Sequence, residues 1–241
     1  MNKETIVIIG GTGSIGYALA NEIKKNNFKP YLVARNEELL KKASIELDCE
    51  YSAIDVTNTE KLKNELNNLT QNVYGLAYCT GSINLKPLKL SNEKDFIDSY
   101  KINTLGAVVA VKSLLSSLIK NKGSVLFFSS IAAQKGFKNH TITSSAKGAI
   151  EAITLSLASE LAPNVRVNCI APSITNSNMS KLILSNQIIK KSIENMHPIP
   201  KIGKSEDFSK LSSFLLSKDN SWITGQIMRI DGGRSTLNSK N

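Results

Sequence analysis

The stretch that decides the fold is TIVIIGGTGSIG, residues Thr5 to Gly16, close to the amino terminus. Its first five residues form an apolar run of the length of a buried strand, and a helix is predicted to begin near Ser14. The glycines between them permit a tight turn and let backbone N–H groups approach a pyrophosphate at the helix N-terminus. A glycine turn between a strand and a helix predicts a dinucleotide-binding site, with a purely structural turn as the alternative. The predicted contacts are Gly10, Thr12, Gly13, Ser14, Ile15 and Gly16.

The rest of the chain alternates short apolar runs with longer amphipathic ones, which is the pattern of βαβ units. We therefore predict an α/β fold: a single Rossmann-like, doubly wound domain over residues 1–241, with a seven-stranded parallel sheet flanked by helices. The predicted strands are Thr5–Ile9, Pro30–Ala34, Cys49–Ile54, Tyr74–Cys79, Ser124–Phe128, Val165–Ile170 and Gln226–Ile230. The predicted helices begin near Ser14 and near Glu37, follow Asn58 as far as Leu69, and span Ser91–Lys120 and Ser144–Leu161.

Residues 173–200 interrupt this rhythm. Pro172, Pro198 and Pro200 bracket a helical run predicted from Met179 to Met196. Long excursions of this kind in compact α/β domains often cover a site, so we predict a substrate lid. A rigid surface helix is the alternative.

The bulk properties favour one compact domain, because 241 residues with 41% hydrophobic content can build a full core. No window approaches the ~18 consecutive apolar residues of a membrane span, and the apolar stretch at the amino terminus is too short for a signal peptide. Cys49, Cys79 and Cys169 are far apart, which predicts buried thiols in a reducing compartment rather than disulfides or metal ligands. We expect a cytoplasmic protein with no membrane partner and no metal.

The formal net charge of +10 comes mostly from lysine. A positive surface attracts anions in general, including phosphorylated cofactors and nucleic acid. The lysines are scattered along the predicted helices, without a dense run or interleaved aromatic residues, so we expect a solvated surface and no nucleic-acid partner.

The end of the second predicted strand indicates which dinucleotide binds. Ala34-Arg35-Asn36 stands where a protein specific for NAD tends to place Asp or Glu for the ribose hydroxyls. A guanidinium can pair with a 2′-phosphate, which a carboxylate would repel. Arg35 and Asn36 therefore predict NADP(H) as the cofactor over NAD(H), with helix capping or a surface role for Arg35 as the alternative.

The sequence from Thr5 to Gly233 resembles the short-chain dehydrogenase/reductase family. The resemblance implies that Asp55-Val56 contacts the adenine and that Asn103 holds a proton-relay water. Tyr78-Cys79-Thr80-Gly81 stands where the family usually shows Asn-Asn-Ala-Gly, and Ala171-Pro172-Ser173 resembles its Pro-Gly turn beside the nicotinamide. The residues thereby implied in cofactor binding are Asp55, Val56, Cys79, Thr80, Gly81, Pro172 and Ser173.

The same resemblance assigns the catalytic residues. Ser130 aligns with the catalytic serine of the family, and Lys147 fits the lysine of its Tyr-x-x-x-Lys motif, which also binds the nicotinamide ribose. The residue four positions before Lys147 should be tyrosine, and it is Thr143. A phenol has a pKa near ~10, within reach of a neighbouring ammonium, whereas an aliphatic hydroxyl is far less acidic and that of threonine is too short to reach the same point. The sequence therefore predicts an atypical member that lacks the catalytic tyrosine.

His140 is a candidate replacement for the missing acid. It lies seven residues before Lys147, the Tyr-x6-Lys spacing of the enoyl-acyl-carrier-protein reductase branch, and histidine exchanges protons near neutral pH. The alternative is a histidine without catalytic role, as found at this place in ordinary members. His197, beside Pro198, is interpreted as structural or surface.

Two functions remain open at this point. The first is an atypical NADP(H)-dependent oxidoreductase that acts on a carbonyl or activated-alkene small molecule through Asn103, Ser130 and Lys147, with a water or His140 as acid. The second is a non-catalytic NADP-binding sensor or partner subunit. The resemblance also implies a homodimer or homotetramer through the helix Ser144–Leu161, whose small and apolar residues exceed what one sheet-facing stripe needs.

Overall fold

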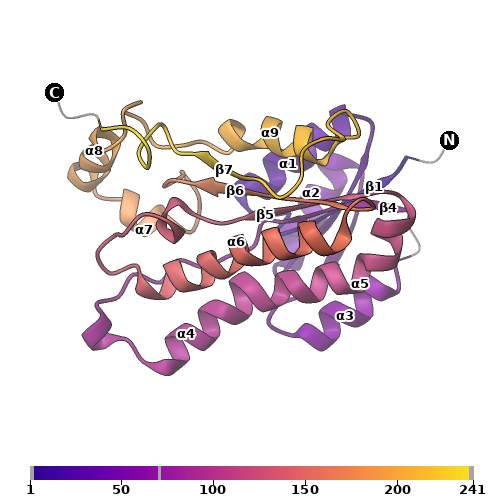
Figure 1. The fold of residues 1–241 in the computed structure, drawn as a ribbon, viewed down its shortest axis with the longest axis horizontal. Coiled ribbons are helices and arrows are strands. Elements are labelled where there is room, and N and C mark those ends of the chain that lie inside the picture. Colours follow the sequence, from indigo (N-terminus) through magenta and orange to yellow (C-terminus); the bar gives the residue numbers. More distant parts are fainter. Residues whose placement is uncertain (1–2, 70–71, 239–241) are drawn as a thin grey trace.

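A parallel seven-stranded sheet runs through the middle of the molecule (Figure 1). The computed structural model describes residues 3–69 and 72–238, so residues 1–2, 70–71 and 239–241 of the predicted domain lie outside the described part. Within that part the strand order is β3-β2-β1-β4-β5-β6-β7, and every neighbouring pair is parallel. The strands are β1 (Thr5–Ile9), β2 (Lys29–Ala34), β3 (Glu50–Ala53), β4 (Val73–Tyr78), β5 (Ser124–Phe128), β6 (Arg166–Pro172) and β7 (Ile227–Ile230). All seven predicted strands are confirmed, and several of their ends shift by one or more residues.

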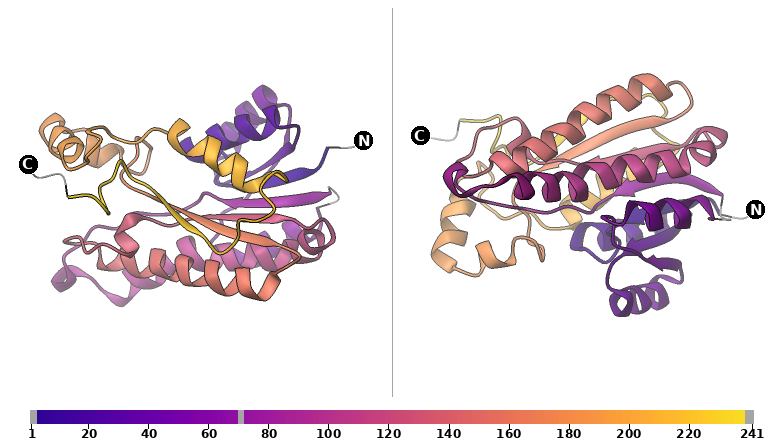
Figure 2. Two further views of the ribbon diagram at one scale, coloured as in Figure 1. Left: turned by 45° about the horizontal axis from the view of Figure 1, so that its top comes forward. Right: turned by 90° about the horizontal axis from the view of Figure 1, so that it is seen from below.

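Helices cover both faces of the sheet, which makes three layers (Figure 1 and Figure 2). On one face lie α1 (Ser14–Lys25), α2 (Glu37–Leu47) and α9 (Glu206–Leu216). On the other lie α3 (Thr59–Asn67), α4 (Glu93–Tyr100), α5 (Gly106–Lys120) and α6 (Thr141–Leu161). Two short helices, α7 (Lys181–Leu184) and α8 (Gln187–Asn195), sit at the end of the sheet where the strands finish. The predicted doubly wound α/β fold is therefore confirmed.

The apolar run of β1 explains why the sheet is buried on both faces. Val7 and Ile9 pack into one hydrophobic cluster, with side chains of α3, α5 and α6. Ile6 and Ile8 pack into the other cluster, with side chains of α1, α2 and α9. A strand covered on both sides needs apolar residues at every position, which is why β1 shows no polar alternation.

Helix α9 was not predicted from the sequence, because much of its buried face consists of serine. Ser209, Ser212 and Ser213 are all buried, where leucine or alanine would have shown the helical period. The hydroxyl of Ser212 donates to the carbonyl of Phe208 one turn earlier (2.8 Å), and that of Ser213 accepts from Asn26 at the end of α1 (2.7 Å). Small, internally bonded side chains thus let α9 lie close against α1.

Three predicted helices have different limits in the structure. The run predicted as Ser91–Lys120 begins at Glu93, after a capping box of Asn92 and Asp95, and contains a π-helical turn, η2 (Lys101–Leu105), between α4 and α5. Helix α6 begins three residues earlier than predicted, at Thr141. The predicted helix Met179–Met196 is two helices, because Asn186 caps a new N-terminus through the backbone N–H groups of Ile188 and Ile189.

The segment Glu93–Lys120 is long and apolar enough to cross a membrane by length and composition alone. Its α5 part buries Ala107, Ala110, Leu114 and Leu118 in the core beside the sheet. The segment therefore has the contacts of a core helix.

Candidate active site

A cavity of about 290 Å³ opens at the carboxyl ends of the strands. Residues that follow β4, β5 and β6 line it, together with the turn Gly13–Gly16, the start of α6 and parts of the segment 173–193. In open α/β sheets ligands bind in this crevice, where the strand order reverses between β1 and β4. The cavity is therefore the candidate site.

The glycine turn after β1 forms a cradle that only glycine backbone fits. Gly10 has φ +87°, and a Cβ there would lie 2.8 Å from Thr80 Oγ1. A Cβ on Gly16 would lie 2.3 Å from the carbonyl oxygen of Gly10, so the first turn of α1 can pack against the loop only without a side chain. Gly13 is the N-cap of α1 and offers no side-chain acceptor to the first N–H groups of the helix. These groups fit an anion such as a pyrophosphate, and the contact of Gly13, Ser14, Ile15 and Gly16 with a pyrophosphate stays a prediction.

The loop after β4 forms the next wall of the cavity. Cys79, Thr80 and Gly81 line it, and their contact with a cofactor stays a prediction. A Cβ on Gly81 would lie 2.8 Å from Asn103 Oδ1 and 2.9 Å from Lys147 Nζ. Gly81 therefore lets the loop pass close to two of the predicted catalytic side chains.

Asn103 lies behind this wall, in the π-helical turn η2, and is 1% exposed. Its Nδ2 donates to the Ser99 carbonyl (2.9 Å) and to Ser82 Oγ (3.0 Å), while its Oδ1 accepts from the Ser82 backbone (3.2 Å). Single π-turns within helices are frequent at functional sites because they redirect a side chain. Here the turn aims Asn103 at the loop that follows Gly81.

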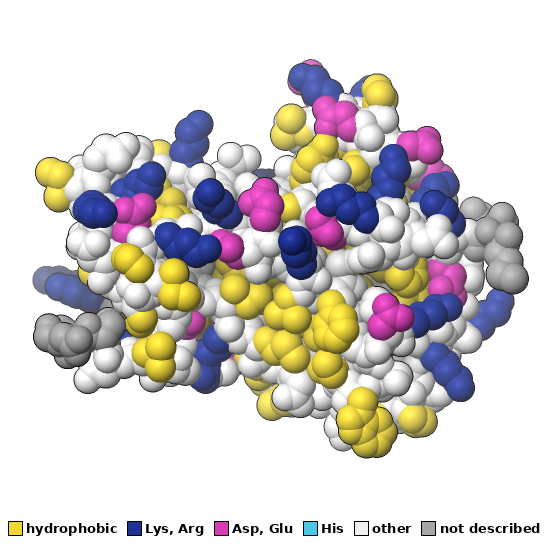
Figure 3. All heavy atoms as spheres, turned by 90° about the horizontal axis from the view of Figure 1, so that it is seen from above, with side chains coloured by type: hydrophobic (Ala, Val, Ile, Leu, Met, Phe, Trp, Pro, Cys, Tyr) yellow, Lys and Arg dark blue, Asp and Glu magenta, His cyan; other side chains and the backbone are white. Residues whose placement is uncertain are grey.

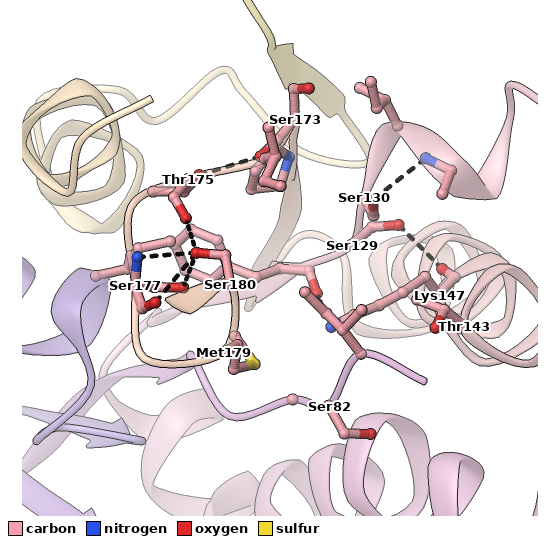
Figure 4. A pocket seen from close by; sticks show the side chains of 18 of the residues that line it. Ser82, Ser129, Ser130, Thr143, Lys147, Ser173, Thr175, Ser177, Met179 and Ser180 are labelled. Atoms are coloured by element: carbon pink, nitrogen blue, oxygen red, sulfur yellow. Dashed lines mark hydrogen bonds between the residues drawn. The ribbon is translucent and has the colours of Figure 1, made fainter. Parts of the chain in front are cut away.

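Ser130 lies two residues after the end of β5 and is the N-cap of the short helix η3 (Ile131–Ala133). Its hydroxyl accepts a hydrogen bond from the backbone N–H of Ala132 (3.2 Å). The hydroxyl proton is therefore left to donate toward the cavity, which Ser130 lines (Figure 4).

Lys147 reaches the cavity from α6 and is almost completely buried. Its Nζ donates to the carbonyl oxygen of Phe128 (2.9 Å). No carboxylate of the described residues 3–69 and 72–238 forms an ion pair with it, and burial lowers the pKa of this amine from 10.5 to about 8. The Ser129 hydroxyl lies within hydrogen-bond distance of both the Lys147 carbonyl (3.0 Å) and the Glu151 carboxylate (2.9 Å), so its single proton is shared between them, and this contact fixes the backbone nearby. The amine is thus a rigidly placed donor.

Thr143 lies one helical turn before Lys147 and is 4% exposed. Its Oγ1 donates to the Asn84 carbonyl and accepts from the Asn84 N–H, both at 3.0 Å. The hydroxyl therefore holds the loop after β4 against α6. None of the six tyrosines of the chain is among the cavity-lining residues in the described part.

His140 also lines the cavity, at the residue before α6. Its Nδ1 lies 2.7 Å from the carbonyl oxygen of Lys138, and because a carbonyl can only accept, Nδ1 carries the proton. The other ring nitrogen, Nε2, has no hydrogen-bond partner among the described residues. The structure therefore brings the candidate acid to the same cavity as Ser130 and Lys147.

His197 is buried rather than at the surface, and its contacts support the structural interpretation. Its Nδ1 is 2.7 Å from the Ile193 carbonyl and its Nε2 is 2.8 Å from Ser173 Oγ. It joins the end of α8 to the turn after β6. Ser173 and the last residue of β6, Pro172, line the cavity, and their contact with a cofactor stays a prediction.

The residues predicted to face the adenine half of the cofactor lie outside the cavity, at the ends of β2 and β3. The exposed guanidinium of Arg35 is 3.7 Å from Asp55. Burial raises the pKa of the Asp55 carboxyl, but hydrogen bonds from Thr57 and the charge of Arg35 outweigh burial and hold the pKa below its usual range. Asn36 caps α2 by accepting from Leu39 (2.9 Å), and Val56 is buried in the core. An exposed arginine at this edge fits a 2′-phosphate, whereas the Asn36 side chain is already used by the helix.

The burial of the thiols differs in part from the sequence expectation. Cys169 is buried, while Cys49 and Cys79 are only half-buried, and all three are free. The segment 173–193 does line the cavity, and Figure 4 shows Ser177 and Met179 across from Ser130 and Lys147. Whether it moves stays a prediction.

Two features of the cavity were not found from the sequence. Asn84 pairs with Thr143 through its backbone, which no side-chain pattern reveals. Arg234 lines the cavity from the turn after β7, about 90 residues beyond the start of α6. Its position directly after Gly232-Gly233 was the one available signal.

A parallel Rossmann-like sheet with a glycine cradle, a serine after β5 and a buried lysine on α6 defines a dinucleotide-dependent α/β enzyme class. The family model described as enoyl-(acyl carrier protein) reductase matches residues 10–235. The chain belongs to the short-chain dehydrogenase/reductase family of NAD(P)-dependent oxidoreductases.

Two relatives show the extent of the similarity. The chain is 26% identical to a 3-oxoacyl-[acyl-carrier-protein] reductase of Bos taurus over 233 residues, which cover 94% of this chain and 95% of that one. It is 26% identical to carbonyl reductase family member 4 of Danio rerio over 238 residues, 96% and 98% of the two chains. The match is thus with whole proteins.

Solved structures agree closely with the fold. A short-chain type dehydrogenase/reductase from Mycobacterium ulcerans superposes with a TM-score of 0.91 at 25% identity, covering 98% of this chain and 90% of that one. ElxO with NADP bound superposes with a TM-score of 0.90 at 28% identity, covering 98% and 100%. A Tyr-to-Phe variant of ElxO with NADPH bound gives the same values.

Proposed function

We propose that this protein is an NADP(H)-dependent oxidoreductase that acts on a carbonyl or activated alkene of a small molecule, without the catalytic tyrosine of its family. The observation that carries the proposal is that one cavity contains the cradle of Gly13–Gly16, Ser130 and Lys147. When bound, the cofactor supplies the hydride. The structures of ElxO with NADP and with NADPH support the choice of cofactor.

The preference for NADP(H) over NAD(H) rests on Arg35. Its guanidinium is exposed at the end of β2, where it is free to pair with a 2′-phosphate. Its 3.7 Å ion pair with Asp55 is long, and the exposed guanidinium keeps N–H groups with which to bind a phosphate. The first N–H groups of α1 would hold the pyrophosphate, and Lys147 the nicotinamide ribose.

Ser130 and Lys147 would then position the substrate. The Ser130 hydroxyl, whose oxygen accepts from Ala132, would donate its hydrogen to the substrate oxygen. The ammonium of Lys147 would raise the local potential and favour negative charge on that oxygen. Asn103 holds Ser82 and the adjoining loop in place, which fixes the wall opposite.

Thr143 cannot serve as the acid in this arrangement. Its hydroxyl is used in both directions by the Asn84 backbone and its side chain is buried. We propose that His140 or a water supplies the proton, and the unpartnered Nε2 of His140 in the cavity favours the histidine. Loss of a positioned acid typically lowers the rate ~10²–10⁴-fold, so turnover is slow and still measurable.

The test is oxidation of NADPH by the isolated protein across a panel of ketones, oxo-esters and enoyl thioesters, with Lys147→Ala as the blank. We expect at least one substrate to be turned over above the blank. A panel with no signal above the blank, while NADPH still binds, favours the second candidate function: a non-catalytic NADP-binding sensor or partner subunit. The engaged hydroxyl of Thr143 is the observation in favour of that candidate.

The assembly and partners proposed for the protein follow from its surface. Large hydrophobic side chains are exposed on the helical face of α4, α5 and α6, among them Tyr100, Ile119 and Leu155. We propose that this face is buried in a homodimer or homotetramer. On the face shown in Figure 3, lysine and arginine side chains are interspersed with acidic ones, which favours a protein without a nucleic-acid partner. The free cysteines favour a reducing compartment, and we propose a cytoplasmic protein without a membrane partner.

A further inference from the structure

The cavity carries positive charge at a place that the proposed reaction does not use. Of its lining residues in the described part of the chain, Lys147 and Arg234 are the ones with full charges, and no aspartate or glutamate is among them. Lys147 is assigned to the cofactor ribose and the reacting oxygen. Arg234 is left without a role.

Arg234 is held in place by apolar and polar neighbours. Its guanidinium carbon lies 4.9 Å from the centre of the Phe137 ring, and its Nη1 donates to Ser173 Oγ (3.3 Å). Its Nη2 contacts the sulfur of Met196 (3.5 Å). Lys135 donates to the Arg234 carbonyl (2.7 Å), which fixes the backbone. A guanidinium that lies over an aromatic ring and contacts neighbours through both terminal nitrogens is preorganised to bind a ligand.

Among the described residues no acidic side chain forms an ion pair with this guanidinium. Burial lowers the pKa of Arg234, and the charge of Asp231 offsets this only in part. The nearest acid in sequence, Asp231, accepts from the backbone N–H of Gly233 (2.9 Å) and from both the N–H (2.9 Å) and the hydroxyl of Ser235. Its carboxylate is therefore used to shape the turn that carries Arg234. A half-buried cation without a carboxylate partner is costly unless a ligand supplies the negative charge.

Apolar side chains make up a large part of the cavity that Arg234 shares with the reacting groups. Phe137 lies beside His140, with ring centres 5.3 Å apart, and Ile83, Ile183 and Ile193 line the same cavity. An occupant that spans this space needs an apolar body, with an anionic group at one end and the reacting carbonyl or alkene at Ser130 and Lys147.

We infer that Arg234 binds a carboxylate of the substrate, so that the substrate class is an oxo acid or unsaturated acid with an apolar chain or ring between its carboxylate and its reacting group. This inference rests on the proposed function and names its substrate class. Each terminal nitrogen of Arg234 carries a second N–H besides the one directed at Ser173 or Met196, and two guanidinium N–H groups can pair with one carboxylate.

The test measures binding, so that it does not depend on turnover. The protein saturated with NADPH is titrated by calorimetry with octanoate and 3-phenylpropanoate, each compared with its neutral amide. We expect the acids to bind about 10- to 100-fold more tightly than the amides, the range for hydrogen bonds to a charged group. Equal affinities of acid and amide overturn the inference even if NADPH oxidation is found with neutral ketones.

Variants test whether Arg234 causes the preference for acids over amides. Arg234→Gln is expected to abolish the preference for acids, and Arg234→Lys to restore it in part, while the affinity for NADPH stays within about twofold. The matched control is Arg229→Gln, which removes the same charge from a side chain outside the cavity that contacts Gln134. A tenfold loss of NADPH affinity in Arg234→Gln would assign the arginine to the cofactor and overturn the inference. Tighter binding of octyl phosphate than of octanoate would exclude the carboxylate as the recognised group.

Discussion

Replacing Lys147 by methionine should make the cofactor-free protein more stable and inactive. The lysine is buried, donates to the Phe128 carbonyl (2.9 Å) and has no ion-pair partner in the described part of the chain. Methionine has nearly the same length and shape and carries no charge. The change therefore removes a buried cation and leaves the packing of α6 in place.

The magnitude follows from the pKa. A fall from 10.5 to about 8 corresponds to about 3 kcal/mol of cost for keeping the amine protonated in the folded state. Loss of the hydrogen bond to Phe128 subtracts about 1 kcal/mol. At pH 7 we therefore expect the free energy of unfolding of Lys147→Met to exceed that of the wild type by about 2 kcal/mol.

The pH dependence has a definite sign. The unfolded chain keeps this proton up to about pH 10.5, and the folded chain only up to about pH 8. Stability rises with pH wherever the unfolded state binds more protons, so the wild type recovers the cost between these two values. The advantage of the variant should be complete below pH 8 and should disappear as the pH approaches 10.5.

The assay is urea unfolding of both proteins without cofactor, at several pH values from 7 to 10. Groups that titrate alike in the two proteins cancel in the difference. A variant that is less stable than the wild type at pH 7, or a difference that does not change with pH, would refute the account of Lys147 as an uncompensated buried cation.

Three further outcomes follow from the site. Arg35→Glu should weaken NADPH binding about 10- to 100-fold and leave NADH binding unchanged or tighter in fluorescence titrations, because a carboxylate repels the 2′-phosphate; equal losses for both cofactors would contradict the role of the arginine. Gly16→Ala should lower the melting temperature and abolish NADPH binding, because its Cβ would lie 2.3 Å from a carbonyl oxygen. The control Gly148→Ala places a Cβ that meets nothing within 4 Å, so its melting temperature and its NADPH binding should be unchanged. In NADPH-oxidation assays Thr143→Tyr should reduce carbonyls up to ~10²-fold faster than Thr143→Phe. Both variants should lose about 1–3 kcal/mol of stability, because both lose the two hydrogen bonds to Asn84. Equal rates for the two variants would show that the rest of the site cannot use a phenol.

The fold could be predicted from the sequence because its signals are local. The apolar run of β1 and the glycine turn after it predict a buried parallel strand and a helix N-terminus within twelve residues. Helix α9 escaped because Ser209, Ser212 and Ser213 bury a face that carries no hydrophobic period. The break between α7 and α8 escaped because it depends on the capping side chain of Asn186.

The site was predictable only where residues follow a strand directly or stand at a fixed spacing. Ser130 and Lys147 were assigned through the resemblance to family motifs of fixed spacing, and the structure brings both to the cavity. The partner of Thr143 is a backbone group 59 residues away, and Arg234 reaches the cavity from the far end of the chain. Contacts of this kind depend on how the loops pack at the edge of the sheet, which no local pattern encodes.

The most direct test of the central claim is a structure of the protein with NADP(H). The account predicts the pyrophosphate at the first N–H groups of α1, the 2′-phosphate at Arg35, and the nicotinamide beside Pro172 with Ser130 and Lys147 within hydrogen-bond reach of its reacting face or ribose. A cofactor bound elsewhere, or a nicotinamide turned away from Ser130 and Lys147, would contradict it.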